Sequence, residues 1–557
     1  MNYQETPRLS KQDVNTSILT LGTGWTGLQT AALLADLGYQ VVLADEDGQV
    51  PGNRSSVHVF EGLAEDFDAS LDKSIEFVRS HEKIEVLPET RLVALQGMPG
   101  RFSAVLRSGG TPLEREVGSV VLATDIAVKP LFAEYGLEPS EHVLSQSQLE
   151  SKLKEAGRDT TAPHEATVAF LVGLAQEGNP VTMRRVMRSV EALEDRGCRV
   201  FVYVDNLKVA ANGLERLYRS NRDKGAIYFK LRESPKISAE DLSITSYDPV
   251  LGKDVQLRPD TIVVEEALLA NSNNTELADI LRLDLGPWSF LQEDNVHRLP
   301  VQSNREGVFV AGEARDIPEM AEIWNDAANV ALQVRELLGQ GQILLPEYKG
   351  LIDKEKCCFC LTCYRCCPHG AISWDDKPFI SPAACQACGI CASECPQDAI
   401  QIVEYSDETV KSKIRTALKE AGAVKEPTIV AFCCENSAQE AWSMAQSFSR
   451  PLPPGLQTIK VPCAGKVDID YIYTALTQGA DGVAVLSCHS ANCRSVRGNT
   501  FASWRVDLAQ KMLQQAGLDQ ERLLFHTLAS NMDHDLSATL LTLEKQLKAL
   551  GPSPVKP

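Results

Sequence analysis

Short apolar segments alternate with longer amphipathic ones along most of the chain, a pattern typical of α/β proteins with parallel sheets. The first apolar segment, residues 17–21, is followed by a tight turn and by a helical segment that runs through residues 28–38. Further strands are predicted at 39–44, 117–124 and 166–173. Because 557 residues exceed what one hydrophobic core can hold, we expect an α/β protein of several domains.

Three more apolar strands are predicted near the C-terminus, at 428–434, 456–463 and 482–488, and each ends at a cysteine. The carboxyl ends of such strands gather at one edge of an open α/β sheet, so these thiols are expected to converge. Cys493 follows Cys488 by five residues and completes a set of four. Four convergent thiols imply a [2Fe–2S] cluster or zinc, the alternative being buried cysteines that bind nothing. The preceding segment 403–427, rich in Lys, Glu and Ser, is expected to be a linker.

Between these regions lie two consecutive cysteine runs with the spacing C-x2-C-x2-C-x3-C-P. The first holds Cys357, Cys360, Cys363 and Cys367, and the second holds Cys385, Cys388, Cys391 and Cys395. This spacing is that of ferredoxins with two [4Fe–4S] clusters, in which the fourth Cys of one run binds the other cluster. We therefore predict that Cys395 completes the first ligand set and Cys367 the second. Zinc knuckles or disulfides are the alternative, but zinc sites need only two C-x-x-C pairs. Cys358 and Cys366, which are out of register, are expected to be buried.

The first strand, turn and helix carry a dinucleotide fingerprint. Its glycines provide the tight turn, the close approach to a pyrophosphate and the helix packing, and an acid after the second strand binds the ribose. The N–H groups at the start of the helix favour the anionic phosphates. The predicted cofactor-binding residues of this part are Gly22, Thr23, Gly24, Trp25, Thr26, Gly27 and Asp45.

Later segments favour FAD over NAD. Residues 117–124 end at Thr124 and are similar to the return strand of flavoproteins with two dinucleotide domains, although Asp125 stands where that group usually has Gly. Residues 301–313 resemble the segment that closes the FAD site in the same group. The predicted contacts of this segment and of the helix start that follows are Gly312, Glu313, Ile317 and Pro318. The strands at 166–173 and 198–204 form an insert without a G-x-G-x-x-G sequence, so a nicotinamide site there is doubtful and the insert is interpreted as mainly structural.

The net charge and the distribution of cysteines indicate which partners are excluded and in which compartment the protein is expected. A net charge of −20 argues against nucleic acid or an anionic membrane surface as a partner. No apolar stretch is long enough to span a membrane, and the N-terminal residues lack the apolar core of a secretory signal. Fifteen of the 16 Cys follow residue 350, which suits metal ligation in a reducing cytoplasm. We expect a cytoplasmic protein, either free or held at a membrane complex through partner subunits.

Residues 15–402 resemble the A subunit of heterodisulfide reductase. The features that carry the resemblance are, in chain order, the flavin half, the insert with V-F-V-Y-V-D-N-L, the G-V-F-V-A-G return segment and the double ferredoxin run. The insert of that family carries extra cysteines for another cluster. Only Cys198 lies in this insert, so no such cluster is predicted.

The C-terminal region resembles the delta subunit of the methyl-viologen-reducing hydrogenase. The family pattern C-S-G-R appears as Cys463-Ala-Gly-Lys466, and the pattern C-H-x-x-x-C as residues 488–493. Ser437 stands where the family has its second Cys. The resemblance implies a [2Fe–2S] cluster held by Cys434, Cys463, Cys488 and Cys493, with Cys433 as the reserve ligand.

These features predict a fold of five segments. They are an FAD-binding Rossmann-like domain at 15–160 with its return part at 266–345, an inserted α/β domain at 161–265, a two-[4Fe–4S] ferredoxin domain at 350–405 and a delta-like α/β [2Fe–2S] domain at 425–550.

The expected function is an oxidoreductase subunit that relays electrons between FAD, two [4Fe–4S] clusters and one [2Fe–2S] cluster within a larger complex. No catalytic acid–base residues are predicted. The resemblance implies partners such as the B or C subunits of a disulfide reductase, a hydrogenase or dehydrogenase, or a quinone-linked membrane subunit. Alternatives are a role like that of the B subunit of the quinone-modifying oxidoreductase, a stand-alone NAD(P)H-dependent flavin reductase, or a scaffold with vestigial sites.

Overall fold

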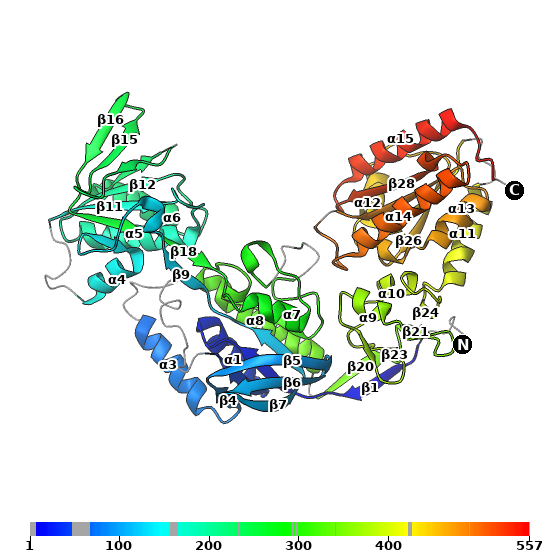
Figure 1. Ribbon diagram of the computed structural model, residues 1–557, viewed down its shortest axis with the longest axis horizontal. Helices are drawn as coiled ribbons and strands as arrows, with labels where there is room; N and C mark the ends of the chain where they lie inside the picture. The colour runs from blue at the N-terminus through cyan, green and yellow to red at the C-terminus, as the bar shows by residue number, and fades with distance from the viewer. Residues whose placement is uncertain are drawn as a thin grey trace.

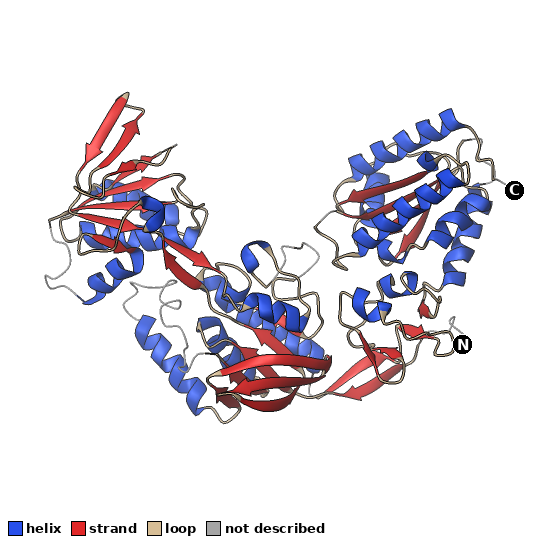
Figure 2. Cartoon of the chain, viewed as in Figure 1, coloured by secondary structure: helices blue, strands red, loops and turns tan. Residues whose placement is uncertain are grey.

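The structure is a computed structural model that describes residues 7–46, 67–155, 165–231, 233–291, 295, 299–339, 341–421, 426–489 and 491–555. Its parts follow one another in an arc, with the inserted domain at the left of Figure 1, the dinucleotide fold below, and the ferredoxin-like and C-terminal domains at the right. Figure 2 shows helices packed around strands in three of these parts, as an α/β fold requires. None of the helices in the described ranges has the length and apolar content needed to cross a bilayer.

The dinucleotide fold is built on a five-stranded parallel sheet. In spatial order its strands are β19 (Val308–Val310), β8 (Ser119–Leu122), β2 (Ser17–Leu21), β3 (Gln40–Ala44) and β4 (Ile84–Leu87). The sheet is covered by helices α1 (Trp25–Asp36), α3 (Phe67–Ser80) and α8 (Met320–Leu338), with α7 (Asn274–Leu281) and the antiparallel strands β5 (Thr90–Met98), β6 (Arg101–Ser108) and β7 (Thr111–Val117) on its other side. The strands are almost wholly buried because helices or strands pack on both faces.

The inserted domain has its own parallel sheet in the order β10, β17, β11, β12, β13. These strands are Val143–Ser145, Thr261–Val264, Thr167–Val172, Arg199–Val204 and Ile227–Lys230, accompanied by α4 (Gln146–Glu155), α5 (Pro180–Glu194), α6 (Leu214–Lys224) and the antiparallel strands β14 (Lys236–Ile237), β15 (Ile244–Asp248) and β16 (Lys253–Leu257). The predicted boundary at residues 160–161 lies outside the described residues, and β10 already belongs to this sheet. An antiparallel pair, β9 (Ala127–Pro130) with β18 (Glu266–Leu269), joins the domain to the dinucleotide fold.

The ferredoxin-like domain is small and consists of two strand pairs and two short helices. The pairs are β21 (Gly350–Ile352) with β24 (Ile400–Ile402) and β22 (Ile372–Trp374) with β23 (Pro378–Ile380), and the helices are α9 (Thr362–Cys366) and α10 (Ile390–Ser393). A two-stranded ribbon of β1 (Leu9–Asp13) and β20 (Gln342–Pro346) leads into it from the dinucleotide fold (Figure 1).

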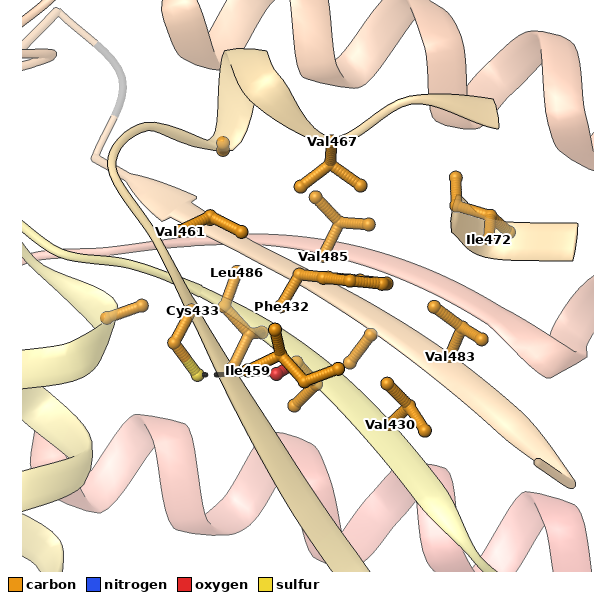
Figure 3. Close-up of a cluster of buried hydrophobic side chains, with 14 of the residues drawn as sticks. Val430, Phe432, Cys433, Ile459, Val461, Val467, Ile472, Val483, Val485 and Leu486 are labelled. Atoms are coloured by element: carbon orange, nitrogen blue, oxygen red, sulfur yellow. Dashed lines mark hydrogen bonds between the residues drawn. The ribbon is translucent and has the colours of Figure 1, made fainter. Parts of the chain in front are cut away.

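The C-terminal domain has a four-stranded parallel sheet in the order β26 (Leu456–Val461), β25 (Ile429–Cys434), β27 (Gly482–Cys488) and β28 (Leu523–Leu528). Its helices are α11 (Asp407–Ala421), α12 (Ala438–Ser447), α13 (Ile469–Thr477), α14 (Gly498–Gln515) and α15 (Asp533–Leu550). The inner strands β25 and β27 are entirely buried, and Figure 3 shows Val430, Phe432, Val483 and Val485 packed between the layers.

The expectation of a linker at residues 403–427 is wrong for most of that segment, because residues 407–421 form α11. The helix packs on β26 and α13 through a narrow apolar stripe that includes the buried Val410 and Ile414. The many charged residues on its other faces obscured this stripe in the sequence. The predicted start of the domain at residue 425 lies outside the described residues.

Candidate functional site

The turn between β2 and α1 is packed so closely that a Cβ at any of its three glycines would clash with a neighbouring atom. A Cβ on Gly22 would lie 2.0 Å from the Ala123 carbonyl oxygen, and one on Gly27 would lie 2.0 Å from the Gly22 carbonyl oxygen. A Cβ on Gly24 would lie 1.7 Å from Asp125 Oδ1, so Asp125, the departure noted in the sequence, occupies space that a side chain at position 24 would need. The turn thus has the close backbone approach that a dinucleotide site requires.

Asp45 sits at the end of β3 beside this turn, as predicted. Its Oδ2 accepts hydrogen bonds from the Thr23 backbone N–H at 2.6 Å and from the Thr23 hydroxyl at 2.7 Å. Asp45 and Gly22 also line a polar cavity of about 120 Å³ that extends to Thr124 and Asn271. The carboxylate is therefore placed at the mouth of a small polar cavity, where the ribose of a dinucleotide would be recognised.

The return segment meets the same turn from the other side. Gly312 has φ +55°, and a Cβ there would lie 2.0 Å from Thr26 Oγ1. The next residue, Glu313, is hydrogen-bonded to the Thr26 hydroxyl, and burial raises the pKa of Glu313 to about 7. Ile317 is half-buried and Pro318 buried just before the N-terminus of α8.

Residues that the sequence did not single out support this arrangement. Asp326 on α8 accepts the Gly312 backbone N–H at 2.9 Å and pairs with Arg315 at 3.1 Å. Asn274 on α7 accepts a hydrogen bond from the Thr124 hydroxyl at 2.9 Å. Both are single polar residues on helices, and nothing in their local sequence marks them. The glycine cradle and the carboxylate of Asp45 are the groups that the phosphates and ribose of a dinucleotide require.

The thiols of the two ferredoxin runs form two crossed groups. Burial, with the neighbouring thiols of Cys360, Cys395 and Cys357, raises the pKa of Cys363 to about 11. In the second group, burial and the nearby thiols of Cys367, Cys388, Cys385 and Cys366 raise the pKa of Cys391 well above its usual value. Cys395 is thus a neighbour of Cys363 and Cys367 a neighbour of Cys391, as a crossed arrangement requires, and Cys366 also lies near Cys391.

The two runs also repeat one another in backbone detail. The thiol of Cys367 accepts the Ala371 N–H, and the thiol of Cys395 accepts the Ala399 N–H, both at 3.4 Å. Leu361 with φ +57° and Gly389 with φ +81° occupy the same place in the two runs. Of the two cysteines out of register, Cys366 is half-buried, but Cys358 is exposed, so its expected burial is wrong.

The cysteines of the C-terminal domain converge at one edge of its sheet, as the strand ends predicted. Cys434 Sγ lies 3.5 Å from Cys488 Sγ, and a Cβ on Gly498 would lie 2.2 Å from Cys463 Sγ and 3.3 Å from Cys493 Sγ. Hydrogen bonds from the Cys493 thiol and the Gly465 N–H lower the pKa of Cys463, although burial opposes them. Gly498, at the start of α14, begins the Gly498-Asn499 pair that the C-terminal region has in common with the delta-subunit pattern, and it lies against two of the thiols.

Cys433 has a different environment from Cys434. Its side chain is fully buried, points among the core side chains in Figure 3, and contacts the Ala431 carbonyl oxygen at 3.8 Å. Burial raises the pKa of Cys433 to about 12. The structure therefore brings Cys434, and not Cys433, to the other three thiols. Within the described ranges, no three His, Cys, Asp or Glu side chains are arranged around a single metal-ion position.

The second ferredoxin group and the C-terminal thiols are neighbours across a tight contact between two loops. Burial raises the pKa of Cys388 well above its usual value, and Cys463 is the first of the thiols that add to this effect. A Cβ on Gly465 would lie 2.6 Å from Ile390 Cγ1, and one on Gly389 would lie 2.6 Å from Lys466 Cδ. The residues that follow these two cysteines thus pack directly on each other.

The dinucleotide fold contacts both cysteine-bearing domains. Asn304 donates to the Pro368 carbonyl oxygen at 2.9 Å, and Asn295 donates to the Cys493 carbonyl oxygen at 3.0 Å. Where the three parts meet there is a cleft of about 1160 Å³ with a largely polar lining that includes Lys349, Cys388 and Arg494. Cys388, a residue of the second ferredoxin group, therefore lies at the wall of this cleft.

The inserted domain presents a turn after β11 at the place where a second dinucleotide fold would bind phosphate. There the buried carboxylate of Glu265 accepts the Gly173 N–H at 2.7 Å and the Ala175 N–H at 3.3 Å. Burial and Glu265 together raise the pKa of Tyr135, whose hydroxyl completes this group. The N–H groups that could bind a phosphate are thus already bonded to a side chain of the protein.

Comparisons with known proteins match the C-terminal domain and the ferredoxin-like domain to separate families. The family described as methyl-viologen-reducing hydrogenase, delta subunit, matches residues 429–551, and the 4Fe-4S binding domain family matches residues 378–401. The iron-sulfur D subunit of the F420-non-reducing hydrogenase of Archaeoglobus profundus is 33% identical over 127 residues, which cover 23% of this chain and 93% of that protein.

A longer relative is the A subunit of the ferredoxin:CoB-CoM heterodisulfide reductase of Methanosarcina mazei, 26% identical over 466 residues, or 79% of this chain. The chain spans 58% of the length of that relative. Among solved structures, thioredoxin reductase of Lactococcus lactis aligns with 58% of this chain and 99% of its own at 14% identity and a TM-score of 0.41, a likeness too weak to support a functional argument.

Proposed function

Because its C-terminal domain belongs to the family of the methyl-viologen-reducing hydrogenase delta subunit and most of the chain is similar to the A subunits of heterodisulfide reductases, we propose that this protein is an electron-transferring flavo-iron–sulfur component of a larger redox complex. The observation that carries the proposal is the direct packing of the Cys388 loop on the Cys463 loop. With this contact, electrons could pass directly between the ferredoxin-like site and the C-terminal site.

The ligand sets follow from the grouping of the thiols. Two [4Fe–4S] clusters are assigned to the crossed groups of the ferredoxin-like domain, the first with Cys395 and the second with Cys367. A [2Fe–2S] cluster is assigned to Cys434, Cys463, Cys488 and Cys493. FAD is assigned to the glycine cradle of the dinucleotide fold with Asp45, Thr124 and Glu313. When bound, the flavin exchanges electrons in pairs and the clusters exchange them singly.

The protein itself supplies placement and shielding. The loops hold their thiols beside backbone N–H groups, such as those of Ala371, Ala399 and Gly465, which stabilise negative charge on the sulfurs. Buried thiols in these groups ionise only with difficulty as free groups, and iron binding would provide the opposing positive charge. This chemistry suits the reducing cytoplasm, and any attachment to a membrane would be through another protein of the complex.

Iron and sulfide analysis of the reconstituted protein tests the cluster assignment. Two four-iron clusters and one two-iron cluster predict about ten iron atoms per chain. Cys434→Ser should reduce this to about eight, since it removes a ligand of the two-iron site, whereas the matched variant Cys433→Ser should keep about ten. A wild-type value near eight would contradict the third cluster, and loss of iron in Cys433→Ser but not in Cys434→Ser would contradict the ligand choice.

The partner is proposed to be another redox protein, of the disulfide reductase, hydrogenase or quinone-linked kind. The polar cleft beside Cys388 is the proposed place of exchange, because it brings solvent, and hence a partner, to a cluster ligand. Native purification followed by mass spectrometry of the bound proteins distinguishes these kinds. Recovery of the chain without any redox partner under native conditions would argue against a role within a complex.

A further inference from the structure

Lys466 is a fully buried lysine at the contact between the two cysteine-bearing loops. Only 1% of its side chain is exposed, and its Nζ lies 3.0 Å from Asp407 Oδ1. The Nζ also contacts the Tyr471 hydroxyl and lies 4.7 Å from the centre of that ring. A lysine is almost never buried unless its charge is paired, and this one is paired with Asp407.

The side chain of Lys466 rests on the ferredoxin loop. A Cβ on Gly389, the residue after Cys388, would lie 2.6 Å from Lys466 Cδ. The first run has Leu361 in the same place with a similar positive φ, so the backbone conformation alone does not demand glycine there. The position next to the second group is therefore kept free of a side chain by the lysine that lies over it.

The backbone of Lys466 is bonded to both loops. Its N–H donates to the Cys463 carbonyl oxygen at 2.9 Å, and its carbonyl oxygen accepts from the Ser393 hydroxyl at 2.7 Å. Ser393 lies on α10, between Cys391 and Cys395. One residue thus touches the C-terminal thiol loop, the loop after Cys388 and the helix that carries Cys391.

The charge of Lys466 is balanced by the partly exposed carboxylate of Asp407. Asp407 begins α11 and keeps 35% of its side chain exposed. Although burial opposes it, Lys466 and the Tyr471 and Gln401 hydrogen bonds lower the pKa of Asp407, so the carboxylate is ionised at neutral pH. A different ion pair, Arg505 with Glu394 at 3.2 Å, joins the C-terminal domain to the ferredoxin-like domain and does not involve Lys466 or Asp407.

We propose that Lys466 is a positioning residue for electron transfer between the second ferredoxin site and the C-terminal thiol site. Its positive charge favours reduction of both centres, and the negative charge of Asp407 opposes reduction of both. The inference rests on the proposed function. In the transfer, one centre loses one electron and the other gains it, so the receiving centre becomes more negative by one charge. A nearby cation stabilises that state and a nearby anion destabilises it.

Redox titration of the full-length reconstituted protein, followed by electron paramagnetic resonance, tests the inference with three variants. Lys466→Met keeps most of the length of the side chain but removes its charge. It should lower the equilibrium constant for reduction of each flanking centre on the order of tenfold. This is the effect of a unit charge over roughly 10 Å at an effective dielectric constant of about 20. Asp407→Asn should raise the same constant, and Lys466→Arg should leave it within about twofold, because it keeps the charge.

A matched control is Lys460→Met, which removes an exposed lysine of the same domain that pairs with Glu435 at 2.5 Å. It should leave both constants unchanged, since an exposed charge is screened by water and salt. A purely structural role predicts that Lys466→Met and Asp407→Asn act in the same direction or lower the iron content without shifting either potential, and either result overturns the inference. If Lys466→Met does not fold, the sign of the Asp407→Asn shift decides.

A failure of the proposed function can be distinguished from a failure of the inference about Lys466. A wild-type iron content near eight would remove the C-terminal cluster whatever the variants do. A wild-type content near ten with no opposite shifts would leave the proposed function in place and overturn only the role of Lys466.

Discussion

At the scale of single residues, the motif residues could be predicted from the sequence and their partners could not. The spacing of the ferredoxin cysteines and of Gly22, Gly24 and Gly27 encodes a local backbone shape, so the positions follow from the sequence. Asp326 and Asp407 act through contacts with residues that other elements of the fold bring to them. Such contacts depend on the packing of whole elements, which no local pattern records.

Glu313 provides a prediction at this scale, because its carboxyl group is fully buried against Thr26 and its pKa is raised to about 7. A raised pKa means that the folded state holds this proton more tightly than the unfolded chain does. The free energy of unfolding should therefore fall as pH rises from about 4.5 through 7, by up to about 3 kcal/mol for a shift of this size.

Glu313→Gln should remove that dependence, since its amide does not ionise. Denaturant unfolding of the dinucleotide fold at pH 5 and pH 8, followed through its tryptophans, measures the difference. The variant should gain stability relative to the wild type at pH 8 compared with pH 5. An equal difference at both pH values would show that Glu313 does not titrate in this range.

At the scale of elements, the apolar strands were predicted correctly and the charged helix was not. Strands β2, β11, β25 and β27 are buried on both faces and appear in the sequence as continuous apolar segments. Helix α11 buries only one stripe, and its Lys and Glu residues dominate the composition of the segment. An average over composition hides a stripe that a helical period of 3.6 residues would have revealed.

Ile414 tests whether α11 is an integral part of the C-terminal domain. Ile414→Ala removes a fully buried side chain from the α11 stripe and should destabilise the domain by about 3 kcal/mol. Hydrogen exchange of the β26 amides, on which α11 packs, should become faster by on the order of a hundredfold. The exposed neighbour Ser412→Ala is the control and should change exchange little. Equal exchange in both variants would mean that the segment is a linker after all.

The turn after β11 gives a second prediction at the element scale. Glu265→Ala would leave the Gly173 and Ala175 N–H groups without their acceptor, and should cost about 2–4 kcal/mol of stability. Glu177→Ala, on the same turn but with a side chain that is 85% exposed, should cost less than about 0.5 kcal/mol. Thermal unfolding of the two variants measures the difference.

The same carboxylate bears on the alternative of a stand-alone NAD(P)H-dependent flavin reductase. A dinucleotide phosphate would have to displace Glu265 from the N–H groups it already bonds. We therefore expect that neither NADH nor NADPH alone bleaches the flavin absorbance of the wild-type protein within seconds. Rapid bleaching would restore that alternative.

At the scale of the whole molecule, the dinucleotide fold contacts both cysteine-bearing domains, and those two domains contact each other. The dinucleotide fold meets the ferredoxin-like domain through Asn304, and that domain meets the C-terminal domain through Gly389 and Lys466. The inserted domain lies at the far end of the arc, away from every cysteine group (Figure 1). The inter-domain contacts could not be predicted from the sequence, since they depend on surfaces that fold separately.

The crossed cysteine groups make a prediction that only the assembled molecule explains. Cys367 belongs to the first run by sequence, yet its thiol lies with Cys385, Cys388 and Cys391. Cys367→Ser should therefore disturb the same cluster as Cys391→Ser, with loss of about four iron atoms and the same change in the paramagnetic resonance spectrum, while Cys363→Ser should alter the other cluster. The adjacent Cys366→Ser, which removes a half-buried thiol outside both sets, should retain all the iron. If the spectrum of Cys367→Ser instead matched that of Cys363→Ser, each run would bind its own cluster and the crossed arrangement would be wrong.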